Sequence, residues 1–578
     1  MLLISGTNAV ITGFEDKLEE HFNLVDLILY NIRNHKQDDN FNKTLEQYKG
    51  ILKTFNILQL NEILVESILN GVDKTFIDEV VKCGANKNIL NIELTGKREF
   101  KKIFPDNFFR KTNYGCSRDR VLLKFLLKEL DNPNLKLKNV IHITGSNGKG
   151  STVTFLRYIL EANGYSVNCF TNPSVMRHNE NFVIRGKEID NDYYNELMLK
   201  IKEAYDKVIL KDDYKLEVED ANDYDLNVVG KNVATNGYAG VNIWVFWSVL
   251  FCMAFLENEA DYNIVEVRNG GIRDVTNVFT ENETIATILT YIQYGIGSND
   301  GVLWMINENG EKENSNRATA YNKAMLGKKN VPMIVANQTD DVLEEIRRIA
   351  KNEVKTETFE YDRDWFVEKE TKRDFVFRCY NKEIVINKNK VLFEDFQTKN
   401  IATALATLCR LNVKLDDELT QRGIDDARFV GRLQKITEGD YVKYFGEDVD
   451  IYSGFIKFND DGVKDTINII NENNKYSYVV YTSNSKKILR KDIDFFKKLS
   501  VLNEDTFKLI IYFKNNRYFD YITGQAQKYN IDYEVKMSLS SALECVKEQI
   551  TDKENSKILI LNDTMSSFDK NIVLINSL

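Results

Sequence analysis

The sequence predicts an α/β fold in which helices cover both faces of a parallel sheet. Short strand-like runs alternate with helical patterns from about residue 140 onward, and this alternation is typical of parallel strands joined by helical crossovers. One of these strands runs directly into a glycine-rich turn that opens a helix, at residues 139–152, NVIHITGSNGKGST. The first hundred or so residues carry apolar side chains at helical spacing instead.

The N-terminal residues 1–115 are predicted to form an all-α extension. Residues 14–32, 45–60 and 60–81 place apolar side chains at helical spacing, with Asn or Gly close to the ends of these segments. The stretch 64–88 faintly suggests two copies of a helical repeat of the ankyrin type, but two copies do not make a repeat array. The extension is therefore either a helical appendage without chemistry of its own or a surface for a protein partner.

Two α/β domains are predicted to follow this extension. In the central domain, residues 116–427, we expect strands at 140–144, 166–170, 263–267, 285–290 and 333–335. Strand-like runs at 478–481, 509–513 and 558–561 predict a smaller C-terminal α/β domain, residues 428–578. The longest apolar run, 241–256, is shorter than the roughly 18 residues that a membrane span needs, so we expect it to form a buried helix.

The glycine-rich turn has the features of a phosphate-binding loop. Gly145, Gly148 and Gly150 let the backbone adopt positive φ, so that consecutive N–H groups can converge on phosphate oxygens. Lys149 supplies a cation, and Ser151 or Thr152 places a hydroxyl at the positive end of the following helix, where a metal-bound triphosphate would lie. The spacing is not the standard one, because position 143 is Ile instead of Gly. We expect a nucleotide to bind Gly145, Asn147, Gly148, Lys149, Gly150, Ser151 and Thr152.

Composition excludes several classes of protein. Lys and Arg number 77 and Asp and Glu number 87 among the 578 residues, and the resulting net charge of −10 would repel the phosphate backbone of a nucleic acid. The apolar start lacks the positive charges of a secretion signal. The seven cysteines are scattered, without a C-x-x-C pair, which indicates a reducing compartment. We therefore expect a cytoplasmic protein that binds neither nucleic acid nor membrane.

Several segments are similar to one family of ATP-dependent ligases. Residues 118–153 follow that family's opening helix, linker and phosphate loop, and residues 160–189 follow it in order and spacing. Further matching segments are 263–279 (NIVEVRNGGIRDVTNVF), 322–335, 396–408 and 428–436 (RFVGRLQKI). The chain resembles the folylpolyglutamate synthase and dihydrofolate synthase family of the Mur-ligase superfamily, clearly over residues 116–460 and weakly beyond them. The resemblance implies a Mur-ligase-like central P-loop domain and a Rossmann-like C-terminal domain, with ATP held between them.

The resemblance also implies an activity and its cofactors. Enzymes of this type use ATP and Mg²⁺ to phosphorylate a carboxylate of a folate or dihydropteroate, and the amino group of glutamate then attacks the acyl phosphate. The substrates would be a folate-type small molecule and glutamate, and we expect the protein to act as a monomer.

The family's functional residues map onto particular positions of this chain. Lys149 is implied in phosphate binding, and Ser151 with Glu266 in holding Mg²⁺. Lys323 matches a lysine, often carbamylated, that helps to place a second metal, and Gln397 and Asn400 match the adenine-side motif. Arg432 matches an arginine that contacts the ATP phosphates. Lys149, Lys323 and Arg432 are thus the implied catalytic residues.

Other positions depart from the family pattern. The chain has four histidines, at 21, 35, 142 and 178, and none follows the glycine-rich loop at 269–271. Ile296, Phe396 and Ile456 stand where the family has histidines, one of them a metal ligand. Asn172 replaces a metal-binding hydroxyl, and Arg268 replaces a glycine.

Two hypotheses follow from these departures, because losing metal ligands is expected to cost orders of magnitude in the rate of phosphoryl transfer. The chain is either a divergent ligase that uses replacement ligands such as Asp274 or Asp300, or a catalytically impaired relative that binds nucleotide or a protein partner. An unrelated P-loop ATPase is a third, weaker alternative. Side-chain oxygens that complete a metal shell near Ser151 and Glu266 would favour the ligase.

Overall fold

The computed structural model describes residues 23–34, 39–91, 103–105, 108–109, 117–172, 174, 178–229, 240–293, 305–306, 312–313, 315–392, 395–429, 434–455, 460–471, 475–483, 495–502, 504–513 and 518–562. The chain divides into two compact units. One unit is Thr95–Phe429, and the other combines Met1–Leu94 with Val430–Leu578.

The unit Thr95–Phe429 is built on an eight-stranded sheet with the order β10-β9-β6-β1-β5-β2-β3-β4. The strands are β1 (Val140–Thr144), β2 (Val167–Phe170), β3 (Phe182–Ile184), β4 (Lys187–Glu188), β5 (Tyr262–Glu266), β6 (Thr284–Leu289), β9 (Met333–Val335) and β10 (Thr358–Glu360). From β10 to β2 the neighbouring strands are parallel, and β3 and β4 are added antiparallel. The five strands predicted from the sequence are confirmed, each within one residue.

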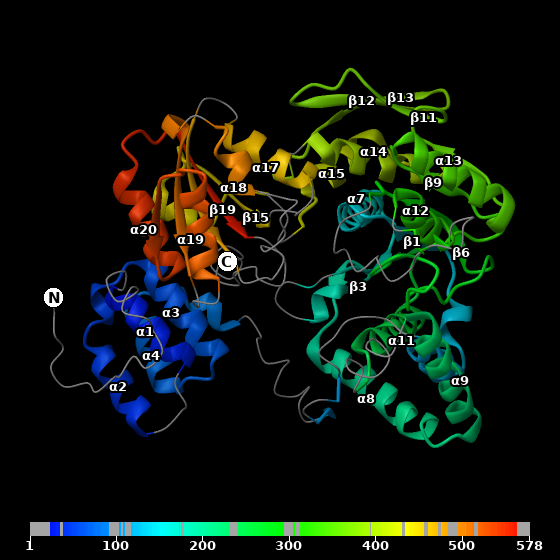
Figure 1. Ribbon diagram of the computed structural model, residues 1–578, viewed down its shortest axis with the longest axis horizontal. Coiled ribbons are helices and arrows are strands. Elements are labelled where there is room, and N and C mark those ends of the chain that lie inside the picture. Colours follow the sequence, from blue (N-terminus) through cyan, green and yellow to red (C-terminus); the bar gives the residue numbers. More distant parts are fainter. Residues whose placement is uncertain are drawn as a thin grey trace. The chain divides into compact units, whose positions relative to one another are not determined.

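Helices cover both faces of this sheet because successive residues of a buried strand point to opposite faces. On β1, Ile141 and Ile143 pack with α7 (Lys149–Ala162), α14 (Asp395–Arg410) and α15 (Asp417–Asp426), whereas Val140 packs with the helices of the other face. Those helices are α6 (Ser117–Glu129), α8 (Asn191–Val208), α9 (Asp212–Val229) and α11 (Ile243–Glu257) (Figure 1). The predicted buried helix is thus α11. None of the helices in the described ranges is long and apolar enough to cross a bilayer.

The same unit contains a small antiparallel sheet that was not predicted. Its strands are β11 (Trp365–Glu368), β12 (Asp374–Cys379) and β13 (Lys382–Asn387), and Phe375 and Phe377 pack into the core shared with α14. A disulfide joins Cys379 at the end of β12 to Cys409 near the end of α14. The scattered cysteines did not predict this pairing, and a disulfide is not typical of the reducing compartment that they indicated. The unit also contains α12 (Asn316–Ala324), α13 (Asp340–Ile349), the following helical turn η7 (Ala350–Val354), and β7 (Met305–Ile306) with β8 (Lys312–Glu313).

The second unit contains a six-stranded sheet with the order β14-β15-β19-β16-β17-β18. Its strands are β14 (Gln434–Ile436), β15 (Asp450–Phe455), β16 (Tyr476–Thr482), β17 (Phe507–Tyr512), β18 (Tyr533–Lys536) and β19 (Ser556–Asn562), and only β14 is antiparallel to its neighbour. The helices are α16 (Asp440–Phe445), α17 (Asp460–Asn471), α18 (Phe495–Leu499), α19 (Phe519–Lys528) and α20 (Leu539–Gln549). The three strands predicted in this region are confirmed.

The predicted helical extension packs against this second sheet domain. It consists of α1 (Leu24–Asn34), α2 (Asp39–Lys49), α3 (Ile57–Leu69) and α4 (Lys74–Lys82), with the short turns η2 (Leu52–Thr54) and η3 (Lys87–Asn91). The interface contains buried hydrogen bonds: Asn61 donates to the Asp440 carboxylate at 2.9 Å, and the backbone N–H of Ser540 donates to Glu62 at 2.8 Å. The extension is therefore attached to α16 and α20 of its own chain. Whether it also binds another protein stays a prediction.

Candidate phosphate-binding site

The loop after β1 has the backbone conformation that only glycine adopts readily. Gly145 has φ +150° and Gly148, which caps the N-terminus of α7, has φ +86°. A Cβ on Gly145 would collide with the Thr290 side chain, and one on Gly148 would collide with the Asn400 side chain. Gly150 differs from the prediction, since it lies in the first turn of α7 and is not among the glycines with positive φ.

Hydrogen bonds attach this loop to the end of β6. The backbone N–H groups of Ser146 and Asn147 donate to the carbonyl of Tyr291 at 2.9 and 3.1 Å. The hydroxyl of Thr290 donates to the carbonyl of Asn147 at 2.6 Å. The N–H groups available to a ligand are therefore those of the first turn of α7, which have no partner within the helix and carry its positive dipole end.

Two lysines converge on one oxygen of the loop. The ammonium groups of Lys149 and Lys323 both donate to the Gly145 carbonyl, at 2.9 and 3.2 Å. Lys323 is almost completely buried, with 1% of its surface exposed. Two like charges so close together repel each other. Phosphate oxygens at this position would offset that repulsion.

The glycine-rich loop after β5 positions Lys323. A Cβ on Gly271 would lie 2.5 Å from the Asn322 carbonyl oxygen and 3.0 Å from the Cα of Lys323, so this close approach requires glycine. The N–H of Ile272 donates to the Asn322 carbonyl at 3.0 Å. The hydroxyl of Thr144, the last residue of β1, donates to the Gly270 carbonyl. The end of α12, and with it Lys323, is thereby held beside the end of β1.

Helix α14 brings two amide side chains to the loop. Gln397 and Asn400 are buried, and the Asn400 amide nitrogen donates to the Gln397 amide oxygen at 2.8 Å. Asn400 also borders Gly148. The amide nitrogen of Gln397 is buried and has no hydrogen-bond partner among the described residues. A buried donor without a partner costs free energy, so this group is suited to a ligand acceptor.

Oxygen donors lie at the ends of the neighbouring elements. Ser151 is buried in the first turn of α7, and the buried Glu266 ends β5 beside Ile143 of β1. The Glu266 carboxylate accepts the backbone N–H of Asn172 at 3.1 Å. The Thr152 hydroxyl is buried without a hydrogen-bond partner among the described residues. Hydroxyl and carboxylate oxygens are the ligands that Mg²⁺ prefers, so Ser151 and Glu266 fit one such ion.

The described residues do not supply an obvious second metal site. The Asp274 carboxylate accepts hydrogen bonds from the backbone N–H groups of Asn269 and Thr276, each at 2.9 Å, and from the Thr276 hydroxyl at 2.7 Å. Its oxygens are therefore already used in hydrogen bonds within the loop 269–276. Phe396 is 40% exposed. In the described ranges no three His, Cys, Asp or Glu side chains come together in a way that could hold a metal. Asp300, Ile296, Ile456 and Arg432 lie outside the described residues.

Sequence reasoning missed several residues that support the site. His142 on β1 is buried and contacts the Thr276 hydroxyl at 2.9 Å through Nε2. Burial, together with the charge of Lys328, holds its pKa well below the usual value, so it is neutral. Thr290 ties the loop to β6. Trp244, which the sequence did not mark, carries on its ring the guanidinium of Arg268 at 4.4 Å. No motif marks these residues, because their role depends on which strands are neighbours.

Comparisons with known proteins agree with this geometry. No family model matches the chain. It is 26% identical over 321 residues to folylpolyglutamate synthase of Lacticaseibacillus casei (54% of this chain, 65% of that protein). It is 25% identical over 334 residues to dihydrofolate synthase/folylpolyglutamate synthase of Bacillus subtilis (55% and 66%). The chain thus spans just under two thirds of the length of these relatives.

A solved structure shares the fold. The bifunctional folylpolyglutamate synthase/dihydrofolate synthase of Yersinia pestis, complexed with AMPPNP and a Mn ion, has a TM-score of 0.57 and 16% identity, covering 82% of this chain and 95% of that one. A parallel sheet with a phosphate loop, followed by a smaller α/β domain, defines the Mur-ligase-like class. The chain shares this fold, and its sequence is similar to that of folylpolyglutamate and dihydrofolate synthases.

Proposed function

We propose that the chain is a divergent ATP-dependent ligase that joins glutamate to a folate or dihydropteroate through an acyl phosphate. The observation that supports this best is the convergence of Lys149 and Lys323 on the Gly145 carbonyl, at the start of a helix whose first-turn amides have no partner within the helix. A loop that binds no phosphate has no need for two cations at one oxygen.

Each side chain has a role in this proposal. Lys149, Lys323 and the N–H groups of the first turn of α7 would hold the β- and γ-phosphates of ATP and stabilise charge on the transferred group. Gln397 and Asn400 would contact the adenine side. Ser151 and Glu266 would hold Mg²⁺, which supplies charge neutralisation to the triphosphate when bound. Arg432 is proposed from the resemblance alone.

The ligand and substrate assignments come from the relatives. The Yersinia pestis protein holds AMPPNP and Mn, and the two bacterial relatives are named for folylpolyglutamate and dihydrofolate synthesis. We extend ATP, a divalent cation, folate and glutamate to this chain on that basis. A monomeric state is part of the same proposal, and so is a cytoplasmic location, although the Cys379–Cys409 disulfide is more typical of an oxidising compartment.

Titration with an ATP analogue tests whether the phosphate loop binds nucleotide, which the proposed ligation requires. Lys149→Ala should remove binding of an ATP analogue in isothermal titration, because the ammonium group faces the ligand and its hydrogen bonds to phosphate are charge-assisted. The melting temperature should stay close to that of the wild type, since Lys149 is not part of the core. Equal affinities in the two proteins would refute the phosphate-loop assignment.

A further inference from the structure

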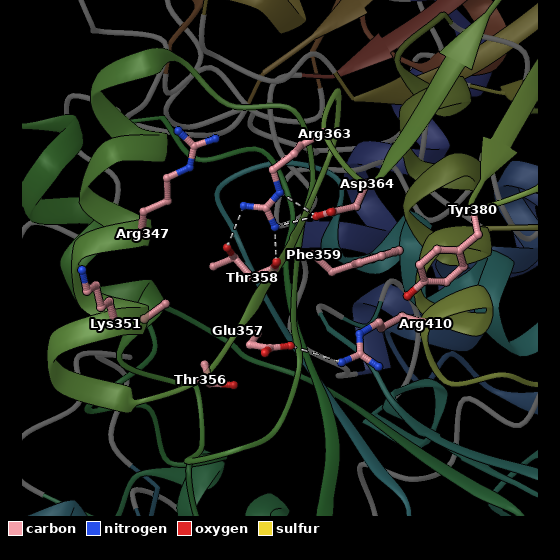
Figure 2. Close-up of a pocket in the computed structure, with 11 residues that line it drawn as sticks. Arg347, Lys351, Thr356, Glu357, Thr358, Phe359, Arg363, Asp364, Tyr380 and Arg410 are labelled. Atoms are coloured by element: carbon pink, nitrogen blue, oxygen red, sulfur yellow. Dashed lines mark hydrogen bonds and ion pairs between the residues drawn. The ribbon is translucent and has the colours of Figure 1, made fainter.

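A cavity of about 610 Å³ lies at the edge of the central sheet, away from the phosphate loop. It lies along β10, the last strand of the sheet, which is separated from β1 by β9 and β6. Figure 2 shows Arg347 and Lys351 of the α13–η7 segment on one side of it and Tyr380 and Arg410 on the other. The residues of the loop and strand between them form its floor.

Positive charge predominates in this cavity although the chain is acidic overall. Four cationic side chains line it, against two acidic ones: Arg347, Lys351, Arg363 and Arg410, against Glu357 and Asp364. A third carboxylate, that of the buried Glu360, lies beneath and is bonded by Arg347. A basic cavity on a chain of net charge −10 attracts anions locally.

Protection of the sheet edge accounts for part of this cluster. An edge strand exposes unpaired backbone groups, and proteins commonly cover them with charged side chains. Arg363 donates to the Thr358 carbonyl, and the Asp364 carboxylate accepts the N–H of Glu360 at 2.7 Å. Those two residues therefore close the edge of β10, and they also pair with each other at 2.6 Å.

The cations on the two side walls are not explained by edge protection. Lys351 makes no ion pair within the described part of the chain. Arg410 only approaches Glu357, at 3.8 Å, and the Glu357 side chain is 89% exposed. Both cationic groups thus retain most of their capacity to bind an anion, and Glu357 is free to turn toward solvent.

Tyr380 adds a second, independent observation. It lies in the two-residue turn between β12 and β13 with φ +51°, a left-handed conformation that costs a non-glycine residue about 1–2 kcal/mol. Its side chain is 59% exposed, and its ring lies 5.5 Å from the Phe359 ring. Strained backbone of this kind is concentrated at ligand-binding positions. A turn without such a role would ordinarily have Gly or Asn here.

The walls of the cavity are also covalently connected. Tyr380 follows Cys379 and Arg410 follows Cys409, and these two cysteines form the disulfide. The tyrosine and the arginine are therefore held on the same side of the cavity without any hydrogen bond between them. Such pre-organisation lowers the entropic cost of binding a ligand.

We propose that this cavity is a binding site for a small polyanion with phosphate or carboxylate groups, held between Lys351 and Arg410 beneath the Tyr380 ring. Arginine forks match the geometry of both kinds of oxyanion, and anionic groups on two sides of the ligand would each meet one of the two available cations. This site is distinct from the phosphate loop and does not depend on the proposed ligase activity.

Isothermal titration with pyrophosphate and with citrate tests the proposal and separates phosphate from carboxylate chemistry. The protein should carry Lys149→Ala, so that the phosphate loop contributes no binding. Adding Lys351→Ala and Arg410→Ala should weaken the affinity for the preferred anion by tenfold or more, as expected for lost charge-assisted hydrogen bonds. The matched control adds Lys187→Ala, at the opposite edge of the same sheet, and Arg422→Ala on α15. It removes the same charge and should leave the affinity unchanged.

Tyr380→Gly separates binding from folding. Because glycine removes the backbone strain, this variant should be at least as stable as the parent protein while binding the anion more weakly. The proposal is overturned if neither anion binds the parent protein. It is also overturned if the control weakens binding as much as the Lys351/Arg410 pair does, or if Tyr380→Gly binds as the parent does, since then only general electrostatic attraction is at work.

Discussion

At the scale of single residues, close approach decides the composition of the phosphate loop. Gly145 and Gly148 are required for two reasons, a positive φ and the lack of space for a Cβ against Thr290 and Asn400. The two glycines therefore keep the loop in contact with β6 and with α14. The docking of α14 depends on this arrangement, and so does the nucleotide binding that we propose.

Gly148→Ala should abolish or strongly weaken binding of an ATP analogue, because the added methyl group displaces Asn400 or the loop. Gly164→Ala is the matched control, since Gly164 has φ +87° but nothing within 4 Å of an added Cβ. The control should lose about 1–2 kcal/mol of stability from backbone strain alone and keep its affinity. Titration calorimetry and thermal melting together distinguish the two effects, and equal loss of affinity in both variants would refute the steric argument.

The buried side chain of Lys328 should make the free energy of unfolding depend on pH. Burial lowers the pKa of its ammonium group from 10.5 to about 8, and its Nζ donates to Asn277 at 2.6 Å. Between these two pH values the unfolded chain binds more protons than the folded one, so folding becomes more favourable as the pH rises. Relative to Lys328→Met, the wild type should gain free energy of unfolding from about pH 8 to pH 10.5. Denaturant titrations across that window measure the difference, and a difference that does not change with pH would contradict the account.

At the scale of secondary-structure elements, α7 and α14 carry the site and α15 supports them. Gly423 on α15 lies against the backbone of α7, where an added Cβ would be 2.5 Å from the Tyr158 carbonyl oxygen and 2.8 Å from the Ile159 Cα. Neither atom belongs to a flexible side chain. The glycine therefore sets the distance between the two helices, and through α7 it influences the phosphate loop.

Gly423→Ala should destabilise the protein by about 1–3 kcal/mol, the usual cost of overpacking a close contact. Gly524→Ala in α19 is the comparison, because nothing lies within 4 Å of its added Cβ. That substitution should be neutral or stabilising, by up to about 1 kcal/mol, since alanine favours a helix interior. Chemical denaturation of both variants gives the two values. A Gly423→Ala protein as stable as the wild type would mean that α15 can move away from α7 without cost.

The elements differed in how well the sequence predicted them, for physical reasons. The central strands such as β1 and β5 are buried almost throughout, so each appears as a short run rich in Val and Ile with clear ends. The strands β11 to β13 form a small sheet in which polar and apolar residues are mixed, as in β13. Such a mixed pattern is hard to distinguish from the pattern of a loop. The disulfide that joins this sheet to α14 depends on a spatial proximity that cysteine spacing does not show.

The sequence predicted which motifs would contribute to the site, but not the contacts that hold their side chains in place. The phosphate loop has a local signal in the sequence, and Glu266, Lys323, Gln397 and Asn400 were assigned through the family resemblance. Their dependence on Thr290, Gly271 and Asn322 follows from strand order and loop packing, which no local pattern specifies. The cavity beside β10 has no motif, because its walls come from four separate segments.

At the scale of the whole molecule, the chain combines two compact units, and the helical extension belongs with the C-terminal domain. Buried hydrogen bonds such as those from Asn61 and Asn86 to Asp440 make this attachment specific, since a buried carboxylate without partners would be costly. The extension is therefore part of the folded unit that contains the second α/β domain. The ligase activity is proposed for the chain with both of these units.

The central claim is that this divergent site still performs ATP-dependent ligation. The most direct measurement incubates the purified protein with ATP, Mg²⁺, glutamate and either a reduced folate or dihydropteroate, and follows the glutamylated product by mass spectrometry together with ADP release. We predict product in equal amount to ADP, at a turnover below the roughly 1 s⁻¹ of ordinary enzymes, because Ile296, Phe396 and Ile456 stand where the family has histidines. Tight, Mg²⁺-dependent ATP binding without any product from either acceptor would contradict the ligase and identify a nucleotide-binding relative that has lost catalysis.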